Sequence, residues 1–355
     1  MIKNKIYIIL LNYNNWKDTI LCIESVLKSE FKDLQLVVVD NNSSDNSMDY
    51  FIKWAEGSLS ITIDETDELK DLYYPPIQKP VPYLFYDLRN TKLDSILKDG
   101  NDNKSVVFIQ TGRNGGFAYG NNIGIKYALA KNDFDYIWIL NNDTVVKKDA
   151  LTQLVEKAEY YKKANKKVGI IGSKIFYYSD PTKINTVGGI YNKWFGVSKH
   201  LGVMEEDKGQ YDCEDIVKKI DYISGASMFV SREFIEDVGF MFEDYFLYYE
   251  ELDWILRGKR KGWQIGYCWN SVVYHKEGGT IGSSFNIRKV SEVAEYWGMR
   301  NRIVFTKKFY PQYLFFIYIS FLRVILSKIK RREFKRLKLI IKAFFGININ
   351  DKTIC

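Results

Sequence analysis

The stretch Asp135-Tyr-Ile-Trp-Ile-Leu-Asn-Asn-Asp-Thr144 decides the fold that we expect for this chain. Its apolar run, residues 136–140, is bounded by polar residues and is typical of a strand covered on both faces, as in a parallel sheet. Polar residues 141–144 follow at once, and ligands of such sheets bind at the carboxyl ends of the strands. A carboxylate and two amides placed there are suited to hold a cation or a phosphate-bearing ligand. The alternative is a polar turn in which Asp143 caps the following helix.

The segments around this strand alternate between strand and helix patterns. Strands are predicted at 6–11, 34–39, 106–110 and 168–171, and helices at 16–29, 48–55 and 147–163. A further helix is predicted to follow the glycine-rich segment 111–122 and to end at about residue 130. This alternation predicts a doubly wound, mostly parallel α/β sheet. Residues 57–104 interrupt the pattern with four of the six prolines, and we expect a partly extended, solvated insertion at the sheet edge.

The second half of the chain is predicted to be more irregular. Short strands are expected within 184–203, two more within 220–230 around Gly225, and two at 263–268 and 271–274, with helices at 250–261 and 289–308. The helix at 250–261 places Asp253 and Arg257 four residues apart on one face, where they can pair.

Composition and charge exclude several classes of protein. The 355 residues are 46% hydrophobic and 27% charged, an ordinary globular balance. Four scattered cysteines without a C-x-x-C pair argue against a disulfide framework or zinc site and suit a reducing compartment. The apolar run at 6–11 is too short for a signal peptide. The net charge of +7 is concentrated at residues 323–342, which hold nine Lys or Arg and one Glu, so nucleic-acid binding by the body is not expected.

A glycine-rich segment, residues 111–122, is predicted to be a loop between a strand and a helix. Its glycines do not have the G-x-G-x-x-G spacing of a dinucleotide site, and the chain has no G-K-[ST] phosphate loop. Glycines at a strand end can still let the backbone approach a ligand closely. Arg113 and Asn114 offer polar contacts there.

Two further features suggest chemistry. Glu250 and Glu251 stand at a helix start among aromatic residues, whose burial of a carboxylate raises its pKa towards that of a general base. The alternative is that they only complement the helix dipole. His275, one of two histidines, ends a predicted strand, and with Asp143 and the phosphate oxygens of a ligand it would make a Mg²⁺ or Mn²⁺ site.

These pieces stand in an order that resembles family 2 glycosyltransferases, in particular the rhamnosyltransferase-like branch that builds bacterial surface polysaccharides. The resemblance covers about residues 5–305. Its motifs are Ile9-Leu-Leu-Asn-Tyr-Asn14, Val39-Asp-Asn-Asn-Ser-Ser-Asp45, Asn114-Gly-Gly-Phe-Ala-x-Gly-Asn-Asn122, Leu140-Asn-Asn-Asp143, Gly225-Ala-Ser227, Tyr249-Glu-Glu-Leu-Asp-x-x-x-Arg257 and His275-x-x-Gly-Gly279.

The resemblance implies a GT-A fold over residues 1–308, a Rossmann-like sheet flanked by helices. Its nucleotide-binding half would be about 1–145, and its acceptor-binding half about 146–308. Contacts with a nucleotide-diphosphate sugar are implied for Asn12, Tyr13, Asp40, Asn42, Arg113, Asn114, Gly115, Asn122, Asn141 and Asn142. The acceptor side is implied for Gly225, Ala226, Ser227 and Asp253.

The resemblance also implies an inverting reaction that depends on Mn²⁺ or Mg²⁺, with Asp143 and His275 as metal ligands. The usual Glu-Asp pair of the family is Glu250-Glu251 here. Glu251 takes the place of the catalytic base, but the longer side chain leaves open which of the two glutamates acts.

The C-terminal segment, residues 309–355, is predicted to be helical, basic and amphipathic. Its apolar run at 313–326 contains Arg323 and falls short of the ~20 residues that cross a bilayer. Apolar residues then recur at helical spacing: Phe334, Leu337, Ile341, Phe344 and Phe345. We expect residues 313–345 to lie on an anionic membrane surface. The alternative is a helical pair packed on the body or on a second copy in a homo-oligomer.

The expected function is therefore transfer of a sugar from a nucleotide-diphosphate donor to a glycan or polyprenyl-linked acceptor in bacterial surface-glycan synthesis. The expected place is the cytoplasmic, inner face of the cell membrane. Two alternatives stay open: a sugar-phosphate nucleotidyltransferase, and a non-catalytic carbohydrate- or membrane-binding module.

Overall fold

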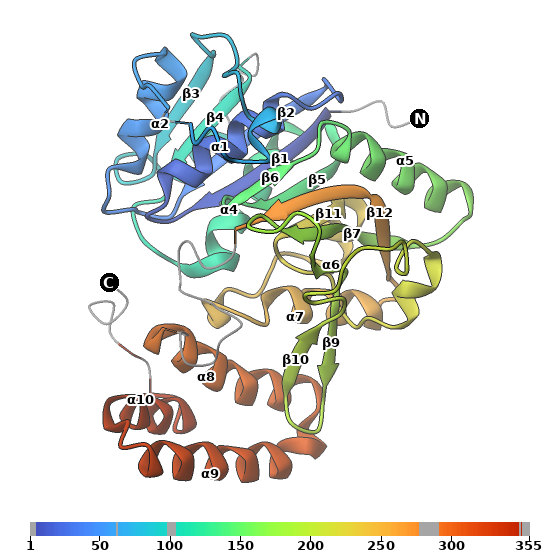
Figure 1. Ribbon diagram of the computed structural model, residues 1–355. Coiled ribbons are helices and arrows are strands. Elements are labelled where there is room, and N and C mark those ends of the chain that lie inside the picture. The colour runs from blue at the N-terminus through green and yellow to red at the C-terminus, as the bar shows by residue number, and fades with distance from the viewer. Residues whose placement is uncertain (1–4, 62, 98–103, 277–290, 348, 350–355) are drawn as a thin grey trace.

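The computed structural model describes residues 5–61, 63–97, 104–276, 291–347 and 349 (Figure 1). Its main sheet has the order β3-β4-β2-β1-β5-β11-β7-β12-β6, with β8 paired to β7. The N-terminal part is wholly parallel, as predicted, and consists of β1 (Lys5–Asn12), β2 (Leu34–Asp40), β3 (Tyr83–Asp87), β4 (Val106–Gln110) and β5 (Phe134–Asn141). The α/β fold class that the sequence predicts is confirmed.

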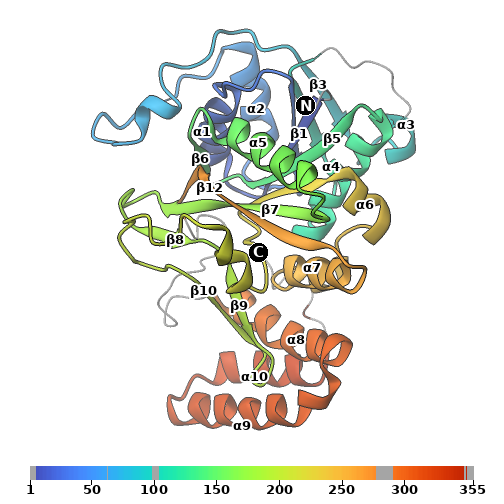
Figure 2. The same cartoon turned by 90° about the vertical axis from the view of Figure 1, so that its right-hand side faces the viewer.

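Apolar residues on both faces of these strands explain why the sheet lies between two layers of helices. Along β1, Ile8 and Leu10 join a core beneath α1 (Trp16–Leu27), α2 (Ser47–Glu56) and α5 (Ala150–Lys163). Tyr7 and Ile9 face the opposite core beneath α4 (Gly116–Lys131), α6 (Arg232–Val238) and α7 (Glu250–Arg260). Figure 2 shows the two layers on either side of β7.

The second half of the sheet mixes strand directions. β11 (Ser227–Ser231) runs antiparallel between β5 and β7 (Val168–Tyr177), while β12 (Gln264–His275) runs parallel to β7 and antiparallel to β6 (Thr144–Val146). Two predictions were wrong here. Only one strand lies near Gly225, and the strands predicted at 263–268 and 271–274 are a single strand with an irregularity between Cys268 and Val272. A bulge interrupts the pairing without ending the strand.

Two helix starts also differ from the prediction. Helix α4 begins at Gly116, inside the glycine-rich segment, because its small residues let the helix pack closely on β1: a Cβ atom at Gly120 would lie 2.1 Å from Leu11. Helix α5 begins at Ala150, after the short strand β6, and its cap residue is Asp149. Asp143 therefore does not cap this helix, and that alternative is wrong.

The insertion at 57–104 contains the 3-10 turn η1 (Lys70–Leu72), the edge strand β3 and helix α3 (Leu93–Leu97). Its place at the sheet edge was predicted, and most of its described residues are exposed or half-buried, as expected of a solvated insertion. The fully buried carboxylate of Glu24 accepts hydrogen bonds from Trp54 Nε1 (2.8 Å) and from the Ile77 amide (2.8 Å), and it pairs with Lys79 Nζ (3.0 Å). These bonds hold the proline-rich part of the insertion against α1.

A smaller region below the sheet carries a β-hairpin and three helices (Figure 1). The hairpin is β9 (Gly189–Asn192) with β10 (Val197–His200), and it follows β8 (Ile184–Thr186). The helices are α8 (Glu292–Phe309), α9 (Leu314–Lys330) and α10 (Phe334–Phe344). Short 3-10 turns lie at Glu214–Lys218 (η2), Glu243–Tyr245 (η3) and Pro311–Tyr313 (η4).

The three C-terminal helices pack on one another through a small apolar cluster of Ile303, Ile317, Phe321 and Ile340. In the described part of the chain, Pro311–Lys330 is the segment long and apolar enough, by length and composition, to cross a membrane, and 22% of its most apolar window is buried. The predicted shortfall in length was therefore wrong, because the helix extends beyond residues 313–326.

Candidate active site

The carboxyl ends of β1, β2 and β5 bring three predicted residues into one buried network. Asn12 and Asp40 are register partners, and Asn12 Nδ2 donates to Asp40 Oδ1 at 2.7 Å. Asn142 Nδ2 donates to Asn12 Oδ1 (3.2 Å) and to the Thr19 hydroxyl (2.8 Å). Burial raises the pKa of Asp40, although Ser43 and Asn12 donate to its carboxylate and oppose the shift. The network fixes the floor of the predicted nucleotide site.

Asn41 joins β2 to the glycine-rich segment, and the sequence reasoning missed it. Its Nδ2 donates to Asn114 Oδ1 (2.9 Å) and to the Gly116 carbonyl (3.1 Å), and its Oδ1 accepts from the Gly115 amide (3.3 Å). The neighbouring Asn42, which was predicted instead, is exposed with φ 63°. Both residues follow the end of β2 at Asp40, so no periodic pattern in the sequence separates the two.

Tyr13 and Arg113 lie at the more open side of this region. Tyr13 is half-buried, and Arg113 is exposed, with its guanidinium 4.4 Å from the centre of the Tyr119 ring. Both stay available to a ligand, and their predicted contacts with the donor stay predictions.

The start of α4 touches the segment that leads into α7. The Phe117 amide donates to the Phe246 carbonyl at 2.8 Å, and a Cβ atom at Gly116 would lie 2.2 Å from that oxygen. Gly116 also has φ +85°, a conformation that favours glycine. Only glycine therefore permits this contact, which brings the glycine-rich segment next to the two glutamates.

The approach to Glu250 is conformationally strained. Phe246, Tyr248 and Tyr249 have φ of 60°, 69° and 77°, unusual values for aromatic residues. Asn301 of α8, which is fully buried, donates from Nδ2 to the carbonyls of Tyr245 (2.6 Å) and Leu247 (2.8 Å) and to that of Tyr248 (3.3 Å). Asn301 thus holds the strained turn in place. No local pattern in the sequence marks it.

The two glutamates differ in accessibility. Glu250 is 1% exposed, and among the described residues its Oε1 has no hydrogen-bond partner. Burial and the charge of Glu251 raise the pKa of Glu250 well above its ordinary value, so it is expected to be neutral. Glu251 is partly exposed, and burial raises its pKa to about 7. A carboxylate with that pKa that solvent can reach is suited to accept a proton near neutral pH.

Glu251 lies beside the predicted acceptor-side segment. A Cβ atom at Gly225 would be 4.0 Å from the carboxyl carbon of Glu251 and 3.5 Å from the Phe117 ring. The next residue, Ala226, accepts a hydrogen bond through its carbonyl from the Asn141 amide at 3.1 Å. Residues 225 and 226 therefore connect Glu251 to the end of β5, which belongs to the stretch 135–144.

Asp143 and His275 meet as predicted, although they are far apart in the sequence. His275 Nε2 lies 3.1 Å from Asp143 Oδ1 and 3.4 Å from Asn141 Nδ2, and the Lys276 amide donates to the Asp143 carbonyl (2.9 Å). Burial acts to raise the pKa of Asp143, but His275 and then Lys276 outweigh it and hold the pKa below its usual value. Asp143 is thus expected to be an anion. Gly278 and Gly279 lie outside the described residues.

Three predicted site residues have internal roles in the structure. Asn122 Nδ2 donates to the Met241 carbonyl and the Glu243 carboxylate, and its Oδ1 accepts from the Met241 amide. Ser227 is fully buried and bonds Trp138 and Ser173. Asp253 is fully buried and pairs with Arg257 (2.7 Å) and Lys308 (2.5 Å). The pairing with Arg257 was predicted from their spacing of four residues. Their predicted contacts with substrates have no geometric support, because these polar groups already serve the fold.

Comparison with known proteins identifies the family of the chain. The sequence matches the family described as Glycosyl transferase family 2 over residues 7–69 and 91–231, more than half of the chain. It is 24% identical over 246 residues to the low-salt glycan biosynthesis hexosyltransferase Agl10 of Haloferax volcanii, covering 68% of this chain and 74% of that protein. It is 28% identical over 209 residues to the dTDP-rhamnosyl transferase RfbF of Shigella flexneri, covering 58% of this chain and 65% of that protein.

A solved structure supports the fold. The structure of GalNAc-T7 with UDP, GalNAc and Mn²⁺ superposes with a TM-score of 0.54 at 14% identity, covering 96% of this chain and 56% of that chain. At this identity the likeness concerns the fold alone, and it agrees with the GT-A arrangement that the sequence predicts.

Proposed function

The chain belongs to glycosyltransferase family 2, and from that premise we propose that it is an inverting, metal-dependent enzyme that uses a nucleoside-diphosphate sugar. The observation that carries the proposal is Glu251, a partly exposed carboxylate with a pKa of about 7 beside the predicted acceptor segment. Family membership favours transfer over the nucleotidyltransferase alternative. The ordered site favours catalysis over a binding module.

The nucleotide is proposed to lie over the carboxyl ends of β1 and β2. Asn12 and Asp40 are already fixed by their mutual hydrogen bond, so little side-chain freedom is lost when a ligand binds. The hydrogen bonds of Asn41 hold Asn114 and Gly115 against the same edge. The backbone of the glycine-rich segment can then approach the sugar or the diphosphate closely.

Glu251 is proposed to take the proton of the acceptor hydroxyl as that oxygen attacks the anomeric carbon from the face opposite the leaving diphosphate. Glu250 is proposed to stay protonated and to raise the pKa of its neighbour by excluding water. Held by Asn301, the turn before α7 keeps both carboxylates in fixed positions. Orientation of both substrates supplies a further large part of the rate.

Asp143 and His275 are proposed to hold Mn²⁺ or Mg²⁺. An anionic carboxylate and an imidazole in direct contact fit such an ion, since carboxylates suit Mn²⁺ and Mg²⁺ and imidazole is a common metal ligand in proteins. No described group of three or more His, Cys, Asp or Glu side chains could hold a metal by itself, so the donor's phosphate oxygens would complete the site. The ion, when bound, neutralises charge on the departing diphosphate.

The donor and product are proposed from the relatives. One is named a hexosyltransferase of glycan biosynthesis and the other a dTDP-rhamnosyl transferase. We therefore expect a hexose or deoxyhexose donor and a role in surface-glycan synthesis. A thermal-shift screen against UDP-, dTDP- and GDP-sugars with Mn²⁺ identifies the base. The donor found there is then used to measure release of the nucleoside diphosphate.

The test of the metal site uses Asp143→Ala in that release assay. The variant should lose Mn²⁺-dependent turnover, and nucleotide-sugar binding without metal should change less. The control is Asp133→Ala, which removes an aspartate paired with Lys5 at the start of the sheet. Turnover of Asp143→Ala equal to wild type would remove this residue from the metal site.

Residues 313–345 are proposed to associate with an anionic membrane surface. Helix α9 exposes apolar side chains along one face, among them Phe315 (68% exposed), Leu322 (56%) and Leu326 (65%). Exposed Arg323 and Lys330 lie on the same helix. This combination of apolar and basic residues is typical of helices at a membrane interface. The proposed place is the inner face of the cell membrane.

Flotation with vesicles tests the membrane proposal. Leu322→Glu/Leu326→Glu should reduce binding to vesicles that contain anionic lipid, whereas Lys208→Glu in the exposed loop after β10 should not. Truncation is a poorer test because α10 packs against Leu247, next to the strained turn. Binding unchanged by the double substitution would contradict the proposal, and a concentration-dependent change in oligomeric state instead would favour contact with a second copy.

A further inference from the structure

An ion pair between Lys276 and Asp18 connects two parts of the proposed donor site. Lys276 directly follows β12, and its Nζ lies 2.6 Å from Asp18 Oδ1 in the first turn of α1. The Lys276 amide also donates to the Asp143 carbonyl at 2.9 Å. Thr19, the residue after Asp18, forms a hydrogen bond of 2.8 Å with Asn12 Oδ1. The pair therefore joins the proposed metal ligands to the floor of the nucleotide site.

The charges around this pair give Lys276 a task that the fold alone does not require. The carboxylates of Asp143 and Asp18 would both repel the diphosphate of a donor that binds between them. Burial acts to raise the pKa of Asp143, and the charges of His275 and Lys276 oppose it, so the ammonium group also acts on that carboxylate. Lys276 is therefore a cation placed between two anions, at the point where a further anion is proposed to bind.

The ion pair is suited to an exchange of partners. The side chains of Lys276 and Asp18 are 22% and 21% exposed, and ion pairs that water can reach contribute little to stability. Asp18 is also stabilised by the positive end of the α1 dipole, so its charge does not depend on Lys276. Lysine carries its charge on a flexible stem and can turn from one anion to another. The folded state would therefore lose little if Lys276 left Asp18.

The insertion holds an aromatic ring in place beside Lys276. The ammonium group lies 4.5 Å from the centre of the Tyr178 ring. The hydroxyls of Tyr178 and Tyr73 both donate to Asp67 Oδ2, the second at 2.5 Å. The Tyr178 amide donates to the His275 carbonyl at 3.0 Å. This cation–π contact keeps the ammonium group next to the metal ligands proposed above.

We propose that Lys276 is a ligand of the donor's diphosphate, which pairs with Asp18 in the free enzyme and turns to the phosphate oxygens when a donor binds. The inference rests on the proposed function and adds a residue that holds the leaving group. A diphosphate carries more negative charge than one carboxylate, so it competes successfully for the ammonium group. Lys276 thereby stabilises the charge that develops on the departing diphosphate.

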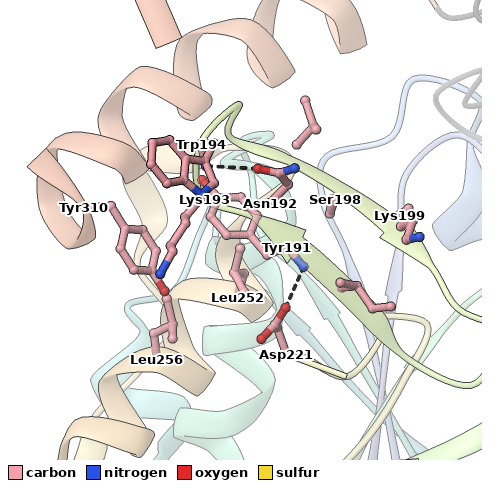
Figure 3. A pocket seen from close by; sticks show the side chains of 12 residues that line it. Tyr191, Asn192, Lys193, Trp194, Ser198, Lys199, Asp221, Leu252, Leu256 and Tyr310 are labelled. Carbon is pink, nitrogen blue, oxygen red and sulfur yellow. Dashed lines mark hydrogen bonds between the residues drawn. The ribbon is translucent and has the colours of Figure 1, made fainter. Parts of the chain in front are cut away.

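A second cationic surface offers another place for an anionic ligand and supplies the control. A pocket of about 690 Å³ lies between the β9–β10 hairpin, α7 and the end of α8, and Lys193 and Lys199 are among its lining residues (Figure 3). Lys193 resembles Lys276 in its surroundings, because its ammonium group lies 5.4 Å from the centre of the Tyr313 ring. Lys193→Met therefore removes a comparable lysine outside the donor site.

The probes are UDP, dTDP and GDP, each compared with its monophosphate by isothermal titration of the full chain. EDTA is present, so that only the protein's own charges act on the second phosphate. For at least one base, the wild type should bind the diphosphate more tightly than the monophosphate by about tenfold or more. Lys276→Met should lose this preference and keep its affinity for the monophosphate. Lys276→Arg should retain part of the preference, and Lys193→Met should retain all of it.

Asp18→Asn distinguishes a diphosphate ligand from a purely structural ion pair. This substitution frees Lys276 from its carboxylate, so the diphosphate should bind at least as tightly as it does to the wild type. If the pair only ties β12 to α1, Asp18→Asn and Lys276→Met should instead weaken the binding of both nucleotides alike. That result would overturn the proposal, as would an unchanged preference in Lys276→Met or a lost preference in Lys193→Met.

Failure of the proposed function is a separate result. It would show in the wild type with Mn²⁺ as an absence of nucleoside-diphosphate-sugar binding and turnover. A wild type that turns over its donor, but binds the diphosphate and the monophosphate equally in EDTA, would overturn only the role of Lys276.

Discussion

Glu251→Gln separates the chemistry of the proposed base from its shape. Glutamine fills nearly the same space as glutamate, but it cannot accept the acceptor's proton. Removal of a positioned general base costs about 10²–10⁴-fold in kcat, so we expect a loss in that range with donor binding little changed. The same substitution on Glu250, whose side chain is 1% exposed, should cost less activity.

The wild-type pH profile follows from the pKa of about 7, which burial raises from 4.5. Because the base acts only when ionised, kcat should fall as the pH decreases through 7, to about one-tenth of its plateau at about pH 6. A glutamate with its ordinary pKa would be almost wholly ionised at both values, and the profile would be flat. The plateau should be reached above about pH 8.

The stability of the folded state should depend on pH in the direction opposite to kcat: it should fall as the pH rises. The folded state holds the Glu251 proton more tightly than the unfolded chain does, so the stabilisation from this group is complete below pH 4.5 and is lost as the pH rises through about 7. Keeping the charged carboxylate in this site costs on the order of 3 kcal/mol above that window. Glu251→Gln removes the charge. It should therefore be more stable than wild type at about pH 8 and about equal to it near pH 4.

The assay is initial-rate release of the nucleoside diphosphate across the pH range, combined with urea unfolding at both ends of it. A flat wild-type profile together with an active Glu251→Gln would refute the assignment of the base. If Glu250→Gln loses the activity instead, the base is the neighbouring residue. A lower stability of Glu251→Gln at high pH would contradict the argument from burial.

Three further substitutions test the frame around the site. Asn301→Ala leaves three backbone carbonyls without their buried donor and should lower the free energy of unfolding by about 3 kcal/mol, as urea denaturation would detect, with a much smaller change expected for exposed Asn270→Ala. Gly116→Ala should lower the free energy of unfolding by at least about 2 kcal/mol more than Gly262→Ala does. Gly262 has a similar φ of +81°, but no atom lies within 4 Å of its new Cβ. Equal losses would disprove the close approach of Gly116 to Phe246. Glu24→Ala leaves its buried partners unpaired and should lower the free energy of unfolding by about 3 kcal/mol. It should also expose residues 57–82 to limited proteolysis. Unchanged protease resistance would show that other contacts hold the insertion.

The parallel half of the sheet could be predicted from the sequence because its strands are buried on both faces. Apolar runs such as 36–39 and 106–109 favour burial on both faces, and the lengths of their segments fit strands, so both the elements and their class follow from local pattern. The polar residues that end these runs necessarily gather at one edge of the sheet. Asn142 was predicted in this way, whereas the family resemblance implied Asn12 and Asp40, and the three side chains form one network.

Tertiary structure alone decided which polar residues remain available. Asn122, Ser227 and Asp253 have the residue types of a site, but each is bonded inside the fold by partners that are distant in the sequence or on another element. Asn41 and Asn301 act through contacts with backbone groups, which no local pattern encodes.

The features that the sequence predicts and those that only the structure reveals therefore differ in the range of the interactions that produce them. The sequence by itself determined which segments are buried and where the strands end, because these properties depend on neighbours along the chain. Only the tertiary structure decided that Asp143 meets His275, that Gly116 touches Phe246, and that a pocket opens between the β9–β10 hairpin and α7. Each of these contacts joins segments far apart in the chain, and their distance depends on how whole layers of the fold pack.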